Sequence, residues 1–499
     1  MSSRSVLVIG AGVAGITAAT HLARAGMHVT VVDKDAAPGG RCGRFVRDGH
    51  RFDTGPTLFV MPLLYEAEFG ALGTSVADRL ELLPVDPTYR LVFDDGRELS
   101  LTSDMEVLRN QLEAIEPGSF RALERYLQDG ARNYRVVAEK MVKCEFRWPT
   151  DYLRLGALGE LARGKLLANH YRRMSAYFSA PRLKSAFTFQ DLYVGLSPFD
   201  APAILSLLSY TELAHGVSYP VGGMYSVVEA LVVLARDAGV DFSFGSTVER
   251  IDITRNTATG VTLADGSRVR ADVVLANADL PYVYERLLPP DRMAGKLSRK
   301  QFSCSSISFF WGLDTRYTAL RPHTLFLAED YRENFDSIVR DHTLPANPSV
   351  YIHAPARLDP SAAPHGRDTI TAIVPVGHLR GDGPDDWSDR RDRAREHVFR
   401  RLRTIGIADL RDHITFEETC TPPTWAQRHN LAKGATHGLA HTLTQMGWLR
   451  PRNRHDRYRN LYFAGASTHP GTGVPTAMSS GRLAARRILA ELRDGAGRS

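Results

Sequence analysis

The stretch SVLVIGAGVAG at residues 5–15 decides the fold of this 499-residue chain. Its first five residues form a short, β-branched run without alternation, which predicts a strand buried in a parallel sheet. Three glycines follow at once, and an Ala-rich stretch to Gly26 predicts a helix. The segment HVTVV at residues 28–32 is the next predicted strand, and Asp33 follows it directly. Together these pieces make a complete βαβ unit of the kind that binds dinucleotides.

Each residue of this unit has a physical role in holding a pyrophosphate. Gly10 permits the tight turn, Gly12 lets the backbone approach the phosphates, and Gly15 lets the helix pack closely on the strand. The N-terminus of the helix supplies free N–H groups and a partial positive charge. Asp33 is placed to accept hydrogen bonds from the ribose hydroxyls, and we count its neighbour Lys34 among the cofactor-binding residues.

Three further segments favour FAD over NAD as the cofactor. The sequence PGGR at residues 38–41 offers a glycine pair and an arginine to the far side of the pyrophosphate. A turn at residues 52–56 brings the backbone toward the cofactor. More than 400 residues later, a predicted strand at 461–464 runs into a glycine-rich turn at 465–475 and then a helix from Thr476. A second strand-to-helix turn of this kind suits a cofactor whose ribityl chain and ring extend across the domain.

The remaining residues that we predict to contact FAD are Gly39, Gly40, Arg41, Gly55, Pro56, Thr57, Val248, Asn277, Gly465, Ala466, Gly473, Val474 and Pro475.

The rest of the chain predicts two insertions into a discontinuous domain. We expect an α/β fold with a Rossmann-like FAD-binding domain made of residues 1–87, 216–280 and 430–499. Residues 88–215 are expected to form a hairpin plus a helical domain for membrane and substrate, and residues 281–429 a substrate-binding domain with a second sheet. The architecture is that of amine-oxidase-like flavoproteins.

Local patterns give the expected elements. The hairpin spans residues 88–101 with Asp95-Gly96 as its turn. The pattern at 105–184 is helical, and another helix is expected at 225–238. Residues 272–277 are expected to return to the nucleotide-binding sheet. Further predicted strands cover residues 248–253, 260–263, 268–270, 305–313, 349–353 and 369–374.

Composition excludes several classes of protein. The chain is 43% hydrophobic and 24% charged, which is typical of globular proteins. Its four cysteines lie far apart with no CxxC pair, which argues against a zinc site or a disulfide framework and fits a reducing cytosol. We therefore predict no metal site. No signal peptide is expected, and the best candidate for a spanning helix, residues 192–211, is interrupted by one glycine and two prolines.

The net charge of +6 weakly suggests an anionic partner. Nucleic acid is a poor candidate, because the basic residues are spread along the chain and no nucleic-acid-binding signature is present. Between Arg154 and Lys184, however, seven Lys or Arg residues face one acid, Glu160. This segment is either a solvated helical face or a patch for anionic lipid headgroups, where each basic residue contributes on the order of 1 kcal/mol.

A resemblance to a known family adds to this interpretation. The chain resembles the bacterial and fungal phytoene desaturases, which are FAD-dependent carotenoid desaturases. The residues that carry the resemblance are 10–15, 38–41, 52–57, 61–62, 189–198, 219–223, 277–279, 430–438 and 460–475. The last segment is the most specific, because most related flavoproteins have an acidic residue where this chain has Ala466-Ser467. One small departure is Asp33, where many members have Glu.

The resemblance implies an enzyme that removes hydrogen from phytoene or a similar C40 polyene in carotenoid biosynthesis. It implies hydride transfer to flavin N5 with proton loss, and oxygen or a quinone as electron acceptor. It also implies a cytoplasmic enzyme peripherally associated with the membrane, and an oligomer is possible. Two alternatives stay open. One is a later-pathway carotenoid oxidoreductase, such as a hydroxycarotenoid 3,4-desaturase, an isomerase or an oxygenase. The other is a non-catalytic flavin-binding protein at the membrane.

Asp151 and Arg154 are the candidate catalytic residues. Their i,i+3 spacing puts them on one face of a helix, and the pair resembles an Asp-x-x-Arg pair of the family. The alternative is a surface ion pair worth under about 1 kcal/mol. His469 is expected to shape the backbone near the flavin rather than to act as a base. Five aromatic residues are candidates for either a polyene tunnel or ordinary core packing: Phe187, Phe189, Tyr193, Phe199 and Tyr210.

Overall fold

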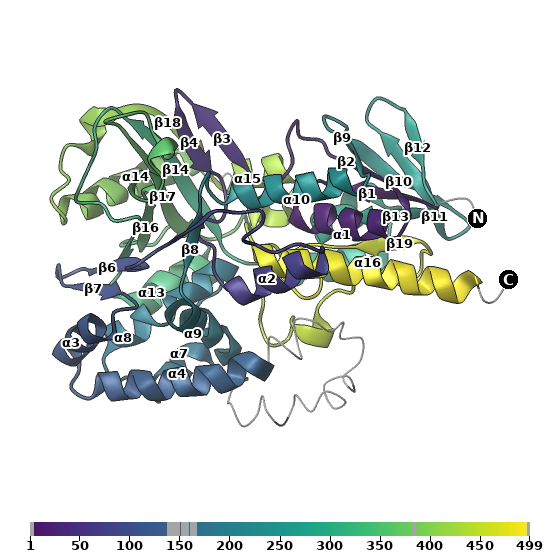
Figure 1. Ribbon diagram of the computed structural model, residues 1–499. Helices are drawn as coiled ribbons and strands as arrows, with labels where there is room; N and C mark the ends of the chain where they lie inside the picture. The colour runs from purple at the N-terminus through teal and green to yellow at the C-terminus, as the bar shows by residue number, and fades with distance from the viewer. Residues whose placement is uncertain (1–3, 137–149, 151–158, 160–166, 382–385, 497–499) are drawn as a thin grey trace.

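The computed structural model describes residues 4–136, 150, 159, 167–381 and 386–496. The chain forms two halves that lie side by side (Figure 1). One half is built on a five-stranded sheet close to both chain ends, and the other on a seven-stranded sheet. Several segments cross between the halves, so each half contains residues from distant parts of the sequence.

The five-stranded sheet is parallel throughout and has the order β19-β13-β1-β2-β9. Its strands are β1 (Ser5–Ile9), β2 (His28–Val32), β9 (Asp241–Ser243), β13 (Val273–Ala276) and β19 (Leu461–Phe463). The predicted βαβ unit is confirmed, and so is the return of residues 272–277 to this sheet. Because all five strands are parallel, the ends of β1, β13 and β19 meet at one edge.

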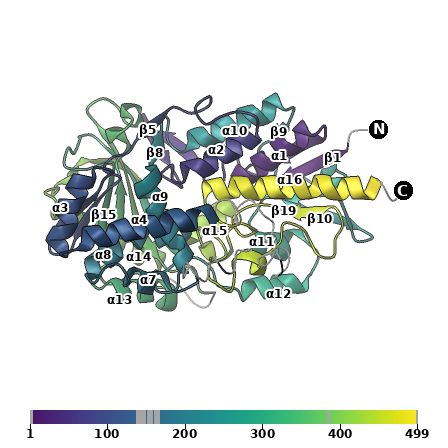
Figure 2. The same ribbon diagram turned by 60° about the horizontal axis from the view of Figure 1, so that its bottom comes forward.

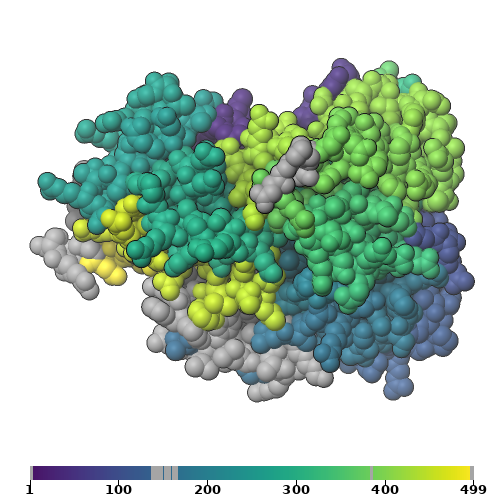
Figure 3. All heavy atoms as spheres, turned by 180° about the vertical axis from the view of Figure 1, so that it is seen from behind, coloured from purple at the N-terminus to yellow at the C-terminus, as the bar shows by residue number. Residues whose placement is uncertain are grey.

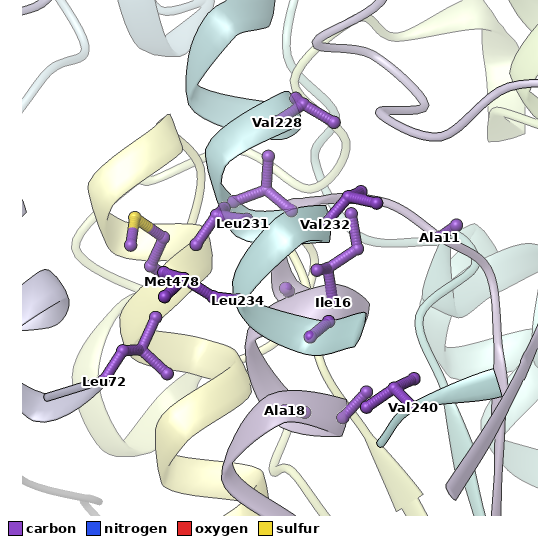
Figure 4. Packing of buried hydrophobic residues seen from close by; sticks show 14 of the residues in the cluster. Ala11, Ile16, Ala18, Leu72, Val228, Leu231, Val232, Leu234, Val240 and Met478 are labelled. Carbon is purple, nitrogen blue, oxygen red and sulfur yellow. The ribbon is translucent and has the colours of Figure 1, made fainter. Parts of the chain in front are cut away.

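Three helices cover one face of this sheet: α1 (Val13–Arg24), α10 (Tyr225–Asp237) and α16 (Val474–Ala496). Figure 4 shows their shared core, in which Ile16 of α1 lies near Leu231 and Leu234 of α10. A side chain at Gly481 of α16 would collide with the backbone of Ala14, so this glycine lets α16 and α1 cross closely. The helix at the end of the chain therefore packs directly on the first helix.

The opposite face of the sheet is covered by an antiparallel meander of three strands. These are β10 (Val248–Thr254), β11 (Thr257–Leu263) and β12 (Arg268–Arg270). The strand positions match the prediction, although β11 starts three residues earlier than expected. Short helices follow on the same side, namely α11 (Leu280–Tyr282) and α12 (Arg292–Ser298).

The second sheet has the order β18-β14-β17-β16-β15-β6-β7. Its strands are β6 (Tyr89–Phe93), β7 (Glu98–Leu101), β14 (Ser305–Leu313), β15 (His323–Leu327), β16 (Val350–His353), β17 (Asp368–Val376) and β18 (Ile414–Cys420). Helix α14 (Trp387–Arg403) packs on one face. The other face carries a helical layer (Figure 2) made of α3 (Met105–Ile115), α4 (Ser119–Val136), α7 (His170–Met174), α8 (Pro181–Ala186) and α9 (Ser206–His215).

The predicted hairpin forms, but its place in the fold corrects our expectation. We grouped it with the helices of residues 88–215, whereas β6 pairs in parallel with β15 inside the second sheet. The reason is burial on both faces of β6. Val92 packs on the side of α14, while Leu91 and Phe93 pack against the helical layer. Such a strand needs a hydrogen-bonded neighbour within a sheet. The other domain limits stay predictions.

Smaller elements complete the fold. They are β3 (Arg44–Arg47), β4 (His50–Asp53), α2 (Pro62–Ala71), β5 (Leu82–Pro84), β8 (Ser218–Pro220), α13 (Tyr331–Asp336) and α15 (Pro422–His429). Helix α2 follows the predicted cofactor turn at residues 52–57, and α16 follows the closing turn at 465–473. A buried ion pair joins these two helices. Glu68 of α2 accepts hydrogen bonds from the Arg482 guanidinium at 2.9 Å and from Ser479 Oγ at 2.6 Å.

We predict that Glu68→Ala lowers the free energy of unfolding by about 3–5 kcal/mol, because it leaves the buried Arg482 cation without its partner. Glu229→Ala is the matched control. It removes the half-exposed partner of Arg44 and is expected to cost under about 1 kcal/mol. Urea unfolding followed by tryptophan fluorescence compares the two. Equal losses would contradict a role for the Glu68 pair in joining the two turns.

Candidate cofactor site and active site

The glycine loop after β1 has the close contacts that the sequence predicts. Gly10 has a φ of +98°, and a side chain at Gly15 would collide with the carbonyl of Gly10. A Cβ atom on Gly12 would lie 2.7 Å from Asn277 Oδ1. Gly12, the N-cap residue of α1, makes no side-chain cap hydrogen bond, and in the first turn Asn277 Oδ1 occupies the Gly15 N–H. The start of this helix, with its partial positive charge, suits an anion.

Asn277 ties this loop to the end of the chain. Its Oδ1 accepts a hydrogen bond from the Gly15 N–H at 3.0 Å, and its Nδ2 donates to the Ala464 carbonyl at 2.9 Å. We predicted Asn277 to contact the cofactor. The structure gives both ends of its amide a backbone partner, so it holds the two cofactor-binding turns beside each other.

Asp33 lies at the end of β2, next to the glycine loop. Its carboxylate accepts hydrogen bonds from the Ala11 N–H at 2.6 Å and from the Asp35 N–H at 2.9 Å. Burial raises the pKa of Asp33. The Ser246 N–H donates to the Asp33 carbonyl, which places the start of β10 beside it. Val248 of β10 is buried in the core that also contains β1 and β2. Val248 thus lies two residues beyond Ser246, which is bonded to Asp33.

Residues 38–41 fold back onto the glycine loop. The Gly39 N–H donates to the Ala11 carbonyl at 2.8 Å, and Gly39 pairs with Gly12 in a short bridge. The side chain of Arg41 is partly buried, and its Nη1 donates to the Thr436 carbonyl at 3.1 Å. Burial lowers the pKa of Arg41, and the nearby Asp279 carboxylate opposes this shift. The arginine is thus a partly buried cation at the edge of the loop.

Lys34 points away from the loop. Its Nζ forms an ion pair with Asp35 at 3.1 Å and donates to the Arg428 carbonyl at 2.5 Å. The structure gives this side chain protein partners at the end of α15, so it ties that helix to the end of β2.

The turn at residues 52–57 connects the two halves of the molecule. Asp53 accepts hydrogen bonds from the Met224 and Tyr225 N–H groups at 2.8 and 3.1 Å, at the start of α10. Burial raises the pKa of Asp53 to about 6. Gly55 packs so tightly on the Arg41 carbonyl that no side chain fits there. Thr57 Oγ1 lies 2.6 Å from the Tyr351 hydroxyl of β16, in the second sheet.

The closing turn at residues 465–473 is held by Arg450, which sequence reasoning missed. The side chain of Arg450 is only 2% exposed. Its guanidinium donates to backbone carbonyls of Leu439, Ala440, Gln445, Ala466 and Thr468. Burial lowers the pKa of Arg450 to about 9. The sequence around it, RPRNRHDRYRN at residues 450–460, is typical of a solvated surface and gave no signal.

Other buried side chains complete the support of the turn. His441 Nε2 accepts from the Thr472 N–H at 3.1 Å, and Asp279 accepts from Ser467 Oγ at 2.6 Å. Asn453 donates to the carbonyl of His469, and Ser480 Oγ donates to the same carbonyl. These two bonds reach His469 through its backbone carbonyl. Seen from behind, the yellow-green residues of this region lie between the two halves (Figure 3).

The chain is similar to several known proteins. The model of the family of flavin containing amine oxidoreductases matches residues 13–489. A phytoene desaturase of Fusarium fujikuroi is 42% identical, over 97% of this chain and 89% of that protein. A zeta-carotene-forming phytoene desaturase of Myxococcus xanthus is 39% identical, over 97% of this chain and 94% of that protein. The chain belongs to the phytoene desaturase family.

A solved putrescine oxidase has the same fold, with a TM-score of 0.64 at 16% identity, over 98% of this chain and 99% of that structure. This likeness confirms the predicted amine-oxidase-like architecture. As a member of the phytoene desaturase family, the chain is an FAD-dependent oxidoreductase. Its residues fit this cofactor. The start of α1, with its glycine N-cap, and the partly buried Arg41 suit the diphosphate, and Asp33 suits the ribose.

Asp151 and Arg154, the predicted catalytic pair, lie outside the described residues, so their role stays a prediction.

Two charged residues of the basic segment have partners within the protein: Arg173 pairs with Asp129, and Arg182 pairs with Asp95. The aromatic candidates all belong to the core between the second sheet and the helical layer, or pack against it. None of the described helices is long and apolar enough to cross a membrane.

We predict that Arg450→Met weakens FAD binding roughly 10- to 100-fold, because two carbonyls of the closing turn, those of Ala466 and Thr468, lose a charged hydrogen-bond donor. Arg452→Met is the control, since that side chain is 37% exposed and lies 3.8 Å from Asp456. Flavin released during dialysis, measured by its absorbance, compares the variants. Equal retention of FAD would show that the turn does not depend on Arg450.

Proposed function

We propose that this protein desaturates a C40 carotenoid precursor of the phytoene type, with FAD as its redox cofactor. The observation that carries the proposal is the likeness to phytoene desaturases along 97% of the chain, with both cofactor turns intact. The glycine loop and the closing turn are more than 400 residues apart in sequence, yet they meet at one sheet edge through Asn277. A protein that only bound a partner would not need both turns.

Desaturation removes a hydride and a proton from adjacent carbons. Bound FAD supplies the hydride-accepting atom, and the chain must hold the polyene and exclude water. The helical layer suits this task. Its core with the second sheet is apolar and rich in aromatic rings, among them Phe187 and Phe189. Thr57 reaches from the predicted FAD turn to Tyr351 beside this core. The electron acceptor in this proposal is oxygen or a quinone.

A later step of the carotenoid pathway is the second candidate, since the residues around the flavin suit either substrate. We predict that phytoene added without oxygen bleaches the flavin absorbance of the purified protein, because hydride transfer reduces FAD. A hydroxylated carotene is the comparison substrate. If only the hydroxylated carotene bleaches the flavin, phytoene desaturation is wrong and the later step is favoured. Bleaching by neither would overturn both assignments.

Peripheral membrane association belongs to this proposal, because a C40 hydrocarbon dissolves in lipid rather than in water. Three apolar side chains in one loop support it. Leu443, Trp448 and Leu449 are 41%, 40% and 37% exposed. A tryptophan beside exposed leucines suits the interface of a bilayer, where amphipathic rings are favoured. The neighbouring Arg450 is buried, so the loop is anchored to the protein.

We predict that the triple variant Leu443→Ser, Trp448→Ser, Leu449→Ser sediments less with phosphatidylglycerol–phosphatidylcholine vesicles, because its loop loses apolar area for the bilayer. It should keep its flavin. The control Val46→Ser, Val233→Ser changes two exposed valines elsewhere, which are 62% and 46% exposed. Equal sedimentation of both variants would rule out the loop as the docking surface.

A further inference from the structure

Residues 189–198 carried part of the family resemblance, and the cofactor site does not use them. In the structure they surround a buried carboxyl group, that of Glu212 on α9. One oxygen of Glu212 accepts hydrogen bonds from the Tyr193 hydroxyl at 2.9 Å and from the Tyr89 hydroxyl at 3.2 Å. The other accepts from Gln190 Nε2 at 3.0 Å. The segment 189–198 thus supplies two of the three donors.

The Glu212 carboxyl is only 6% exposed, and no Lys, Arg or His among the described residues forms an ion pair with it. Burial raises its pKa to about 8, while the donors Gln190 and Tyr89 oppose the shift. The titratable groups that face it or act on it from the surrounding elements are Tyr89, Tyr126, Tyr193 and Tyr351. A carboxyl group in such surroundings holds a proton near neutral pH.

A small cavity beside Glu212 adds a second, independent observation. It is lined by Glu212, by Gln190 and by Thr88, among others. Gln190 is fully buried, and its Oε1 has no hydrogen-bond partner within the described part of the chain. Buried amide oxygens are rarely left without a partner. The pocket is therefore polar on one side, and it is next to the carboxyl group.

The cluster lies close to the cofactor turn. Strands β6 and β15 are neighbours, and Arg90 pairs with Thr324. Tyr89 and His323 each come one residue before that pair, and their rings are 6.1 Å apart. His323 Nδ1 lies 2.7 Å from the Tyr351 hydroxyl, which contacts Thr57. Burial keeps the pKa of His323 well below its ordinary value, so this ring is neutral. Glu212 is thus the acid–base group of the cluster.

We propose that the Glu212 carboxylate takes up the proton that leaves the substrate during desaturation, by way of the Tyr193 hydroxyl. Glu212, Tyr89 and Gln190 are buried, whereas Tyr193 is half-buried and is the member that can face a bound polyene. The tyrosine hydroxyls of Tyr89 and Tyr193 are also in hydrogen-bond contact with each other. This inference rests on the proposed desaturase function.

The step balances in atoms and electrons. One substrate carbon loses a hydride, with its electron pair, to the flavin. The C–H bond of the adjacent carbon breaks, and its electron pair forms the new C=C bond. The released proton passes to the Tyr193 oxygen while the Tyr193 proton passes to Glu212. The two electrons leave later to an acceptor of the oxygen or quinone class.

The pH dependence tests this role. Only ionised Glu212 accepts the proton, so the rate of flavin reduction should rise with pH through about 8. Glu212→Gln should lower this rate on the order of 10²- to 10⁴-fold and remove the rise. Tyr193→Phe keeps the carboxylate and should also slow reduction. Thr211→Val is the control, because its hydroxyl donates to the Leu208 carbonyl of its own helix and not to Glu212.

The measurement is anaerobic stopped-flow reduction of the FAD-loaded protein by the carotene that reduces it, from pH 6 to 9.5. A wild-type rate and pH profile in Glu212→Gln would overturn the proposal. If Glu212→Gln does not retain FAD, Tyr193→Phe is the deciding variant. An unchanged rate of flavin reduction in Tyr193→Phe would also overturn the proposal.

Infrared spectroscopy needs no substrate, so it separates a failure of the role of Glu212 from a failure of the proposed desaturase function. We expect a carboxylic-acid carbonyl band in the wild type that disappears as pH rises through about 8 and is missing in Glu212→Gln. Without that band, Glu212 is not the proton-holding group. With the band but no reduction by any carotene, the desaturase function fails and the proton transfer from substrate fails with it.

Discussion

The amide of Asn277 joins the two turns that we predict to hold the cofactor. One turn follows β1 at the start of the chain, and the other follows β19 near its end. Because β1, β13 and β19 are adjacent and parallel, their carboxyl ends meet at one edge, and the Asn277 side chain spans them. A short mononucleotide would need only the first turn. The second turn has meaning only for a longer cofactor, so the sheet order itself supports FAD.

The charges of the two halves differ in a way that matches their chemistry. Arg450 is buried beside the closing turn, Arg41 is partly buried, and Asp279 is the carboxylate that acts on both. Two cations against one anion leave a positive balance, which a diphosphate can neutralise. In the helical half, Glu212 is buried without an ion-pair partner among the described residues. A carboxylate in apolar surroundings stabilises positive charge that develops on a nearby substrate.

Sequence patterns predicted the parts of this molecule that are set locally. The β1–α1–β2 unit follows from residues 5–33, because its glycines and its hydrophobic run act on near neighbours. The hairpin at 88–101 was predicted as a hairpin, but its partner β15 was not, since pairing between distant strands leaves no local pattern. Arg450 and Glu212 were missed for a related reason. A charged residue looks solvated in sequence, and only the tertiary fold buries it.

Burial of Glu212 also explains why a carboxyl group suits this step better than water. A polyene that has lost a hydride carries positive charge, and water at that position would add to the carbon instead of removing a proton. The apolar helical core keeps water away, and a proton acceptor must therefore belong to the protein. A carboxylate held by three hydrogen bonds is a weak nucleophile but still a base. Its raised pKa is then a consequence of its dry surroundings rather than a demand of the reaction, since a carbocation loses its proton even to a weak base.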